Sequence, residues 1–386
     1  MKILTILTYY RPHTSGLTIY AERLARAFAR RGHQVTVMTT QYDPSLPREE
    51  MMDGVRVLRI PVALRVSKGV LAPTFGLIAT KLVAQHDVVQ LHLPQFDAPG
   101  VAFRARLFGK PAILTYHCDL DLPPGFFNRI VNTVVAFQNN MAGILSNHIV
   151  TYTQDYADNS PFLSRFRNKL TPILPPVELP TPPPGAVEAF ARTNETATRR
   201  PVIGMATRFA SEKGVENLLE AFPAVLAKYP NAQVLFAGQY QNVMGEQTYF
   251  ERLRPQIQKY EASGHWKFLG NLDLEKMAAY YPNLDVLVVP SLNSTEAFGL
   301  VQIEAMLNGV PCIASALPGV RRPVQMHHMG EVTPIGDAPA LAEALLKVLA
   351  NRGKYKCDTA KLARIYDPDS VAIEYENLFA RLMGKK

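Results

Sequence analysis

Two carboxylates, Glu296 and Glu304, lie eight residues apart around Gly299, between segments 285–290 and 310–315 that predict buried strands. A helix is predicted to begin near Gly299, and its first N–H groups have no partner inside the helix, so they favour an anion such as a diphosphate. Gly299 has no Cβ, which lets an anion approach the backbone closely. Carboxylates would repel a diphosphate, but they accept hydrogen bonds from sugar hydroxyls. The pattern therefore describes a nucleotide-sugar site, although two glutamates at this spacing, taken alone, are more often solvated.

A pair of cations, Arg208 and Lys213, follows a predicted strand at 202–206. A forked guanidinium and a point-charge ammonium suit a diphosphate and the charge that builds on it as it leaves. Taken alone, such a pair is more often part of a solvated loop. Beside the two glutamates, it indicates a binding site for the donor diphosphate.

Together these residues resemble the donor-site motif of the retaining glycosyltransferases of family 4. The similar residues are Arg208-x4-Lys213, Glu296-x7-Glu304 around Phe298-Gly299-Leu300, Glu304-Ala305 and Gly309-Val310-Pro311. The resemblance covers nearly the whole chain and is strongest from 200 to 320. It implies the GT-B fold, an α/β architecture with two Rossmann-like domains facing across a cleft, and a hexosyltransferase that retains the configuration of the sugar.

The resemblance also implies a role for each matching residue. Arg208, Lys213 and the N–H groups of Gly299 and Leu300 would stabilise charge on the leaving diphosphate. Glu304 would hold ribose hydroxyls. The implied donor-binding residues are Gly16, Arg208, Lys213, Leu272, Glu296, Phe298, Gly299, Leu300 and Glu304. The implied catalytic residues are His117, Glu296, Arg208 and Lys213.

Two positions in the first half belong to the implied acceptor side. His117 follows a predicted strand at 111–116 and matches the family histidine close to the donor sugar, where it would hold a hydroxyl. A lone histidine is more often structural, but the match favours function. Ser15-Gly16 stands where the family usually has two adjacent glycines, so Ser15 is expected to donate a hydrogen bond there.

A metal site is not predicted. Asp119-Leu120-Asp121 looks like the D-x-D of another glycosyltransferase class, but it lies far in sequence from the diphosphate loop. Carboxylates in a polar loop are the favoured interpretation. The expected enzyme is metal-independent, has no cofactor and takes a nucleotide-sugar as co-substrate.

The domain organisation follows from length and from one proline-rich segment. A chain of 386 residues is expected to form two domains. Residues 171–185 hold seven prolines, which break helices and central strands, so this segment predicts a stiff connector. The predicted divisions are an acceptor-side domain at 1–172, a linker at 173–198, a nucleotide-sugar domain at 199–366 and a C-terminal helix at 367–386 that returns to the first domain.

The alternation of apolar and helical segments predicts a parallel sheet in each half. Ligands bind beyond the carboxyl ends of such strands. The predicted strands lie at 2–8, 34–40, 55–60, 88–93, 111–116, 202–206, 233–237, 266–271, 285–290 and 310–315. The predicted helices lie at 18–31, 126–145, 215–228, 367–383 and from 300 to about 308.

The charge distribution bears on the acceptor. Residues 1–172 hold 19 Lys and Arg against 11 Asp and Glu, whereas the rest of the chain is balanced. Helix 18–31 is predicted to carry Arg23, Arg26 and Arg30 outward, and Arg129 is the only charge between 122 and 147. Helix 126–145 is therefore either a buried core helix or a helix partly open to a lipid acceptor. We therefore expect the first domain to contact an anionic membrane and to glycosylate a lipid or lipid-linked acceptor, with a soluble acceptor as the alternative. No nucleic-acid partner is expected.

The cellular location and the rival functions follow from what the sequence contains. Three scattered cysteines fit a reducing compartment, and the first residues predict a strand, so the expected location is cytoplasmic, peripheral to the inner face of the cell membrane. A UDP-sugar is the favoured donor, with GDP-mannose as the alternative.

Two rival functions remain. A nucleotide-sugar epimerase on the same scaffold would need acid–base groups around the sugar, which one histidine does not supply. A non-catalytic sugar-nucleotide-binding protein would not need all of Arg208, Lys213, Glu296 and Glu304.

Overall fold

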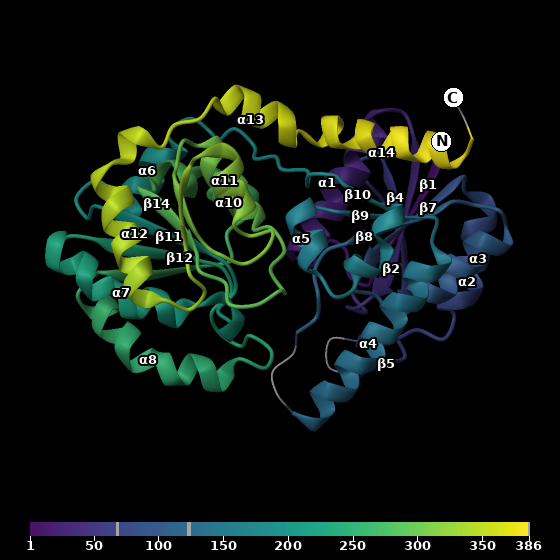
Figure 1. Cartoon of the computed structure of the whole chain (residues 1–386), viewed down its shortest axis with the longest axis horizontal. Helices are drawn as coiled ribbons and strands as arrows, with labels where there is room; N and C mark the ends of the chain where they lie inside the picture. The colour runs from purple at the N-terminus through teal and green to yellow at the C-terminus, as the bar shows by residue number, and fades with distance from the viewer. Residues whose placement is uncertain (67–68, 122–124, 385–386) are drawn as a thin grey trace. The chain divides into compact units, whose positions relative to one another are not determined.

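The computed structural model describes residues 1–66, 69–121 and 125–384, which form two compact α/β units (Figure 1). The first unit comprises Met1–Val177 and Arg364–Lys386, and the second comprises Glu178–Ala363. Each unit is built on a mostly parallel sheet with helices around it, so the predicted α/β class with two Rossmann-like domains is confirmed.

The sheet of the first unit has eight strands in the order β10-β9-β8-β7-β1-β2-β4-β3. All neighbouring pairs are parallel except β3 with β4. The strands are β1 (Lys2–Ile6), β2 (Gln34–Gln41), β3 (Glu49–Met52), β4 (Val55–Pro61), β7 (Val88–Leu93), β8 (Ala112–Tyr116), β9 (His148–Thr151) and β10 (Leu170–Pro172), with a separate hairpin of β5 (Leu64–Val66) and β6 (Gly69–Leu71). The central strands β7 and β8 are buried along their whole length, as parallel strands covered on both faces must be.

Helices of the first unit surround this sheet. They are α1 (Gly16–Arg30), α2 (Phe75–Gln85), α3 (Ala98–Leu107), α4 (Phe126–Leu145), α5 (Gln154–Asn159), η1 (Leu163–Lys169) and α14 (Pro368–Leu382). The helix expected to return to the first domain is α14, which Asp367 caps by accepting a hydrogen bond from the Ser370 N–H at 2.9 Å. It packs on α1, where the hydroxyls of Tyr20 and Tyr375 lie 2.7 Å apart.

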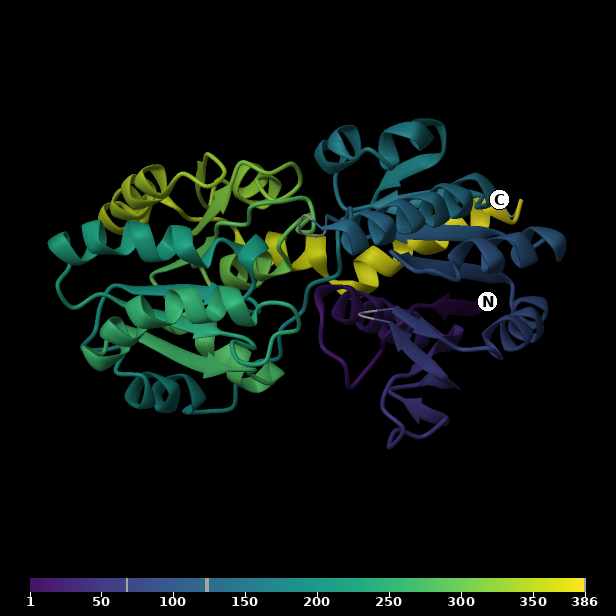
Figure 2. The ribbon, with the colours of Figure 1, turned by 90° about the horizontal axis from the view of Figure 1, so that it is seen from below.

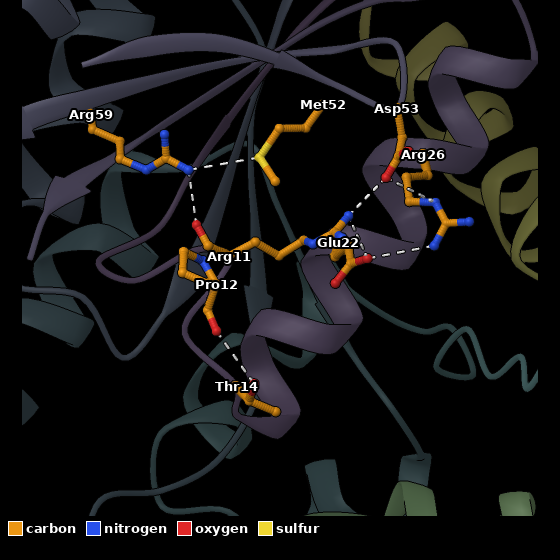
Figure 3. Close-up of polar contacts among 8 residues, drawn as sticks. All are labelled: Arg11, Pro12, Thr14, Glu22, Arg26, Met52, Asp53 and Arg59. Carbon is orange, nitrogen blue, oxygen red and sulfur yellow. Dashed lines mark hydrogen bonds and ion pairs between the residues drawn. The ribbon is translucent and has the colours of Figure 1, made fainter. Parts of the chain in front are cut away.

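The predicted outward arginine face of α1 is wrong for Arg23 and holds only in part for the other two: Arg26 is half-buried, and Arg30 is exposed but paired. Arg23 is buried and its Nη1 donates to the carbonyl oxygen of Pro176 at 3.3 Å. Arg30 pairs with Asp369 of α14 at 3.0 Å. Arg26 lies within ion-pair distance of Glu22 and Asp53, in a cluster that also holds Arg11 (Figure 3). All three side chains are engaged within the unit because α14 and neighbouring loops pack beside the side of α1 that periodicity assigned to solvent.

The boundary between the units falls inside the proline-rich segment, after Val177. Residues 173–177 belong to the first unit, and the Val177 N–H donates to the Tyr366 carbonyl oxygen at 2.8 Å. The rest of the predicted linker belongs to the second unit and includes helix α6 (Ala186–Thr193). The linker is therefore shorter than predicted, because prolines stop at Pro184 and the next residues are good helix formers.

The sheet of the second unit has six parallel strands in the order β13-β12-β11-β14-β15-β16. They are β11 (Val202–Ala206), β12 (Gln233–Ala237), β13 (Trp266–Gly270), β14 (Val286–Val289), β15 (Cys312–Ser315) and β16 (Gly330–Thr333). The helical elements are α6, η2 (Ser211–Lys213), α7 (Val215–Lys228), α8 (Gln247–Ala262), α9 (Leu274–Tyr280), η3 (Tyr281–Asn283), α10 (Leu300–Leu307), α11 (Arg322–His327), α12 (Ala338–Ala350), η4 (Arg352–Lys354) and α13 (Thr359–Tyr366), whose last residues belong to the first unit. The chain first builds outward from β11 through β12 to β13, and then restarts on the other side with β14.

Candidate active site

The strand order of the second unit places its reversal point between β11 and β14. These two strands pair directly, with Ile203 opposite Val286. The strand that follows β11 in the chain, β12, lies on one side of this pair, and the strand that follows β14, β15, lies on the other; ligands of open α/β sheets bind at such a point. Arg208 and Lys213 lie after β11, and Glu296 lies after β14.

An ammonium, a carboxylate and a backbone N–H meet at this reversal point. Lys213 Nζ lies 2.8 Å from Glu296 Oε2. The other carboxylate oxygen, Oε1, accepts a hydrogen bond from the Gly299 N–H at 3.0 Å. The Lys213 side chain is 11% exposed, so its charge sits in a partly desolvated position. The structure thus brings three predicted site residues into direct contact.

Gly214 is what allows the Lys213 loop to approach β14. Its φ of +69° is in the left-handed region, and a Cβ there would lie 2.1 Å from the carbonyl oxygen of Pro290. The two loops also share a backbone hydrogen bond from the Leu292 N–H to the Glu212 carbonyl oxygen at 2.9 Å. Any larger residue at 214 would push the loops apart and move Lys213 away from Glu296.

Arg208 lies on the same loop and pairs with the carboxylate of Glu212, the residue before Lys213. The Arg208 side chain is about one third exposed, whereas that of Glu212 is nearly buried. The loop therefore presents two cations, and each has a carboxylate partner that a more strongly charged diphosphate can replace.

Glu304 lies on α10 and is buried. The Tyr281 hydroxyl donates to its Oε2 at 2.6 Å. Gly299 precedes the helix with a φ of +78°, Leu300 is its first residue, and Phe298 is buried beneath the loop. Leu272 is half-buried in the loop after β13, which β12 separates from β11, so it is remote in the sheet from the reversal point.

The first unit has its own reversal point, between β1 and β7. Ser15 caps α1 after β1, and its Oγ accepts a hydrogen bond from the Thr18 N–H at 3.2 Å. Gly16 is the first residue of α1, and a Cβ there would meet no atom within 4 Å. Sterics inside this unit therefore do not require glycine at position 16.

His117 follows β8 and is buried against a second histidine. Its Nε2 lies 2.8 Å from Nδ1 of His92 on β7, and its Nδ1 contacts the hydroxyl of Tyr152. Burial lowers the pKa of His92 to about 3. Burial, together with the neighbouring His92, also lowers the pKa of His117 well below its ordinary value. Both rings are therefore neutral at physiological pH, and both ring nitrogens of His117 are engaged.

Asp119 is bound within the first unit by hydroxyl groups. It accepts hydrogen bonds from Tyr116 at 2.8 Å, and from Tyr156 and Ser160 at 2.9 Å each. Asp121 is exposed. Over 1–66, 69–121 and 125–384, no group of three or more His, Cys, Asp or Glu side chains is arranged to hold a metal ion.

Comparison with known proteins extends over both units. Residues 15–172 match the family model of the glycosyl transferase 4-like domain, and residues 187–364 match that of the glycosyl transferases group 1. The chain belongs to the group 1 glycosyltransferases of family 4.

Curated relatives of this glycosyltransferase act on different acceptors. A phosphatidyl-myo-inositol mannosyltransferase of Mycobacterium leprae is 28% identical over 98% of this chain and 96% of its own length. A 2-deoxystreptamine N-acetyl-D-glucosaminyltransferase of Streptomyces fradiae is 29% identical over 85% of this chain and 81% of its own.

Solved structures show the same fold. Alr3699/HepE of Anabaena in complex with UDP has a TM-score of 0.76 at 19% identity, covering 99% of this chain and 100% of its own. Sucrose-phosphate synthase of Thermosynechococcus elongatus has a TM-score of 0.75 at 22% identity, covering 99% of both chains. The predicted GT-B fold is therefore confirmed.

Two contacts in this glycosyltransferase were missed from the sequence. His92 could have been found, because it lies near the end of a strand that neighbours the one before His117, and parallel neighbours end at the same edge. Tyr281 gave no signal, because its contact with Glu304 joins residues that are distant in sequence and depends on how η3 packs under α10.

Proposed function

We propose that this glycosyltransferase moves a hexose, mannose first among the candidates, from a nucleotide-diphosphate sugar to a hydroxyl of a lipid acceptor, with retention and without a metal. The observation that carries the proposal is the contact of Lys213, Glu296 and the Gly299 N–H at the reversal point of the second unit. Positive charge and a helix N-terminus suit a diphosphate, and the adjacent carboxylate suits a sugar hydroxyl.

On the donor side, Lys213 and Arg208 exchange their carboxylate partners for phosphate oxygens when the nucleotide-sugar binds. Glu296 is then released to accept a hydrogen bond from a sugar hydroxyl. Glu304, already oriented by Tyr281, accepts hydrogen bonds from ribose hydroxyls. The charge that develops on the leaving diphosphate is stabilised by both cations and by the N–H groups at the start of α10.

The transfer step breaks the bond between the anomeric carbon and the diphosphate oxygen and forms a bond to the acceptor oxygen on the same face. The acceptor proton passes to the departing diphosphate, so the products are a nucleoside diphosphate and a glycoside of unchanged configuration. Neutral His117 supplies no charge to this step; it lies at the carboxyl edge of the first sheet, held by His92 and Tyr152.

The names of similar curated proteins suggest which donors and acceptors to test first. Seven of the similar curated proteins carry names of mannosyl transfer to phosphatidyl-myo-inositol or its monomannoside, and two of these names specify GDP-mannose. We therefore place GDP-mannose ahead of the UDP-sugars that sequence reasoning favoured, and phosphatidylinositol ahead of soluble acceptors. The acceptor would be met at the inner face of the cell membrane; no helix among the described residues is long and apolar enough to cross a bilayer.

The test is a transfer assay with GDP-mannose, UDP-glucose and UDP-N-acetylglucosamine against phosphatidylinositol dispersed in detergent. We expect a glycolipid and free nucleoside diphosphate in equal amounts, and an α-linkage by NMR from an α-linked donor. An altered sugar without free nucleoside diphosphate would indicate an epimerase. Donor binding without turnover on lipid or soluble acceptors would indicate a binding protein.

A further inference from the structure

Most of the exposed large apolar side chains of the first unit lie on or beside adjacent helices, with Met51, Leu64, Leu71 and Ile373 elsewhere. Every exposed phenylalanine among the described residues lies between Phe96 and Phe137. This segment contains α3 and α4, which pack side by side (Figures 1 and 2). Phenylalanine is normally among the most buried residue types, so this concentration marks a surface that is covered in use.

On α4 the exposed apolar residues form one stripe. Phe126, Ile130, Val134 and Phe137 recur at helical spacing, and Phe126 and Phe137 are 84% and 63% exposed. The stripe runs about 16 Å along the helix. The opposite side of α4 carries Asn139 and Ala142, which are buried against the unit.

Helix α3 adds a shorter stripe beside it. Phe103 and Leu107 are 55% and 70% exposed, and Arg106 is exposed between them. The other side of α3 is buried and made of Val101, Ala102 and Ala105. We call the outward side of the two helices the α3–α4 face, with apolar members Phe103, Leu107, Phe126, Ile130, Val134 and Phe137.

The charge of this face has one sign. Neither α3 nor α4 contains Asp or Glu, and neither does the neighbouring α2. Arg106, Arg129 and, on α2, Lys81 are exposed. The acids nearest in sequence lie outside these helices: Asp97 precedes α3, Asp119 is held by the hydroxyls of its own unit, and Asp121 is exposed.

We propose that the α3–α4 face docks this protein on an anionic lipid bilayer. An apolar stripe flanked by cations, on helices that contain no Asp or Glu, is what a leaflet with negative headgroups accommodates, because rings enter the acyl boundary while Arg and Lys stay with the phosphates. A second copy of the chain does not suit the face as well, since a symmetric pairing would set its cations against each other. The inference deepens the proposed function, because it names the surface that would bring the enzyme to a lipid acceptor.

The surface differs from the one expected on α1. There Arg23 is buried and Arg26 and Arg30 form ion pairs within the first unit, whereas here the exposed Arg106 and Arg129 lie beside exposed rings. We therefore expect substitutions on the α3–α4 face to weaken vesicle binding and Arg30→Glu on α1 to leave vesicle binding unchanged.

The test is flotation of the full chain with vesicles of phosphatidylcholine, alone or with phosphatidylglycerol added to about a third of the lipid. We expect the partition coefficient to rise at least about tenfold with the anionic lipid and to fall as salt screens the charges. The double variant Phe126→Asp with Phe137→Asp should have a partition coefficient onto anionic vesicles at least about tenfold lower than the wild type, since both phenylalanine side chains would otherwise enter the leaflet. The matched control is Met244→Asp with Leu274→Asp in the second unit, two apolar residues that are 62% and 48% exposed, and it should bind like the wild type.

Several outcomes would overturn the proposal. One is that the wild type does not bind anionic vesicles at low salt. Another is that the double variant binds them as well as the wild type does. A third is that light scattering shows the wild type self-associating without lipid and the double variant not doing so. Sugar transfer to detergent-dispersed phosphatidylinositol separates the two claims. Sugar transfer without vesicle binding would contradict the docking role of the α3–α4 face but not the proposed function. Vesicle binding without sugar transfer would contradict the proposed function but not the docking role.

Discussion

Replacing Lys213 by alanine tests the donor site most directly. The ammonium lies 2.8 Å from Glu296 and in a partly desolvated position, on a loop that Gly214 holds against the end of β14. At an effective dielectric constant of about 20, a unit charge about 4 Å from another contributes about 4 kcal/mol. About 1.4 kcal/mol corresponds to tenfold in rate, so the upper limit for its loss is about 10³-fold.

The expected loss is smaller than this limit. Glu296, although it has turned to the sugar, still lies on the neighbouring loop and offsets part of the ammonium's field, and the N–H groups at the start of α10 still face the diphosphate. We therefore expect Lys213→Ala to lower turnover by about 10²-fold, the lower end of what removing one transition-state donor costs. The free energy of unfolding should change by only about 1 kcal/mol, because a single partly exposed ion pair is lost.

The measurement is release of nucleoside diphosphate from GDP-mannose with phosphatidylinositol as acceptor, together with urea unfolding of each variant. Lys276→Ala is the matched control, because Lys276 is a well-exposed lysine of the same unit, paired with Asp273 at 3.0 Å. It should keep turnover within about twofold. Turnover of Lys213→Ala within about fivefold of the wild type would refute the assignment of Lys213 to the diphosphate.

Three further predictions follow from the two units. Tyr281→Phe should weaken GDP binding about tenfold in calorimetric titration, because a hydrogen bond to the charged Glu304 contributes about 1.5–3 kcal/mol; unchanged affinity would separate Glu304 from the nucleotide. Turnover should persist in EDTA, because Lys213 supplies positive charge at the diphosphate; loss that Mn²⁺ or Mg²⁺ restores would contradict this. Because burial lowers the pKa values of His92 and His117, the unfolded chain binds more protons than the native chain below pH about 6.5, so stability should be full above that pH and fall as the pH drops towards 5. The loss should approach about 1.4 kcal/mol per pH unit for each histidine in urea unfolding, and His92→Gln should flatten the slope; equal slopes in both proteins would refute the linkage.

The donor site was largely readable from the sequence, because its residues follow strands whose ends are easy to place. Once β11 and β14 are recognised as parallel neighbours, the loops carrying Lys213 and Glu296 must emerge at one edge. What the sequence did not show is the pairing within the site. The Gly299 N–H donates to Glu296, and Lys213 pairs with the same carboxylate. Both contacts depend on the conformation of the loops, which the sequence pattern does not predict.

Long-range packing explains the wrong prediction on α1. Helical periodicity places Arg23 and Arg30 away from the apolar stripe, which normally means solvent. Here Arg23 is buried and donates to the Pro176 carbonyl oxygen, and a helix from the far end of the chain packs on α1, where its Asp369 pairs with the still exposed Arg30. No local pattern in residues 16–30 encodes the presence of α14.

Helix α4 shows that a periodic apolar pattern does not by itself tell whether the apolar side of a helix faces the core or the solvent. The spacing of Phe126, Ile130 and Phe137 correctly indicates that they share one side of a helix, but not whether that side faces the core. The other side decides it: Ala142 and Gly143 are small enough to pack closely, and a Cβ at Gly143 would lie 2.6 Å from the ring of Phe166. Close packing of the small side against the unit leaves the phenylalanines outward, so the side that hydropathy alone would bury is the exposed one.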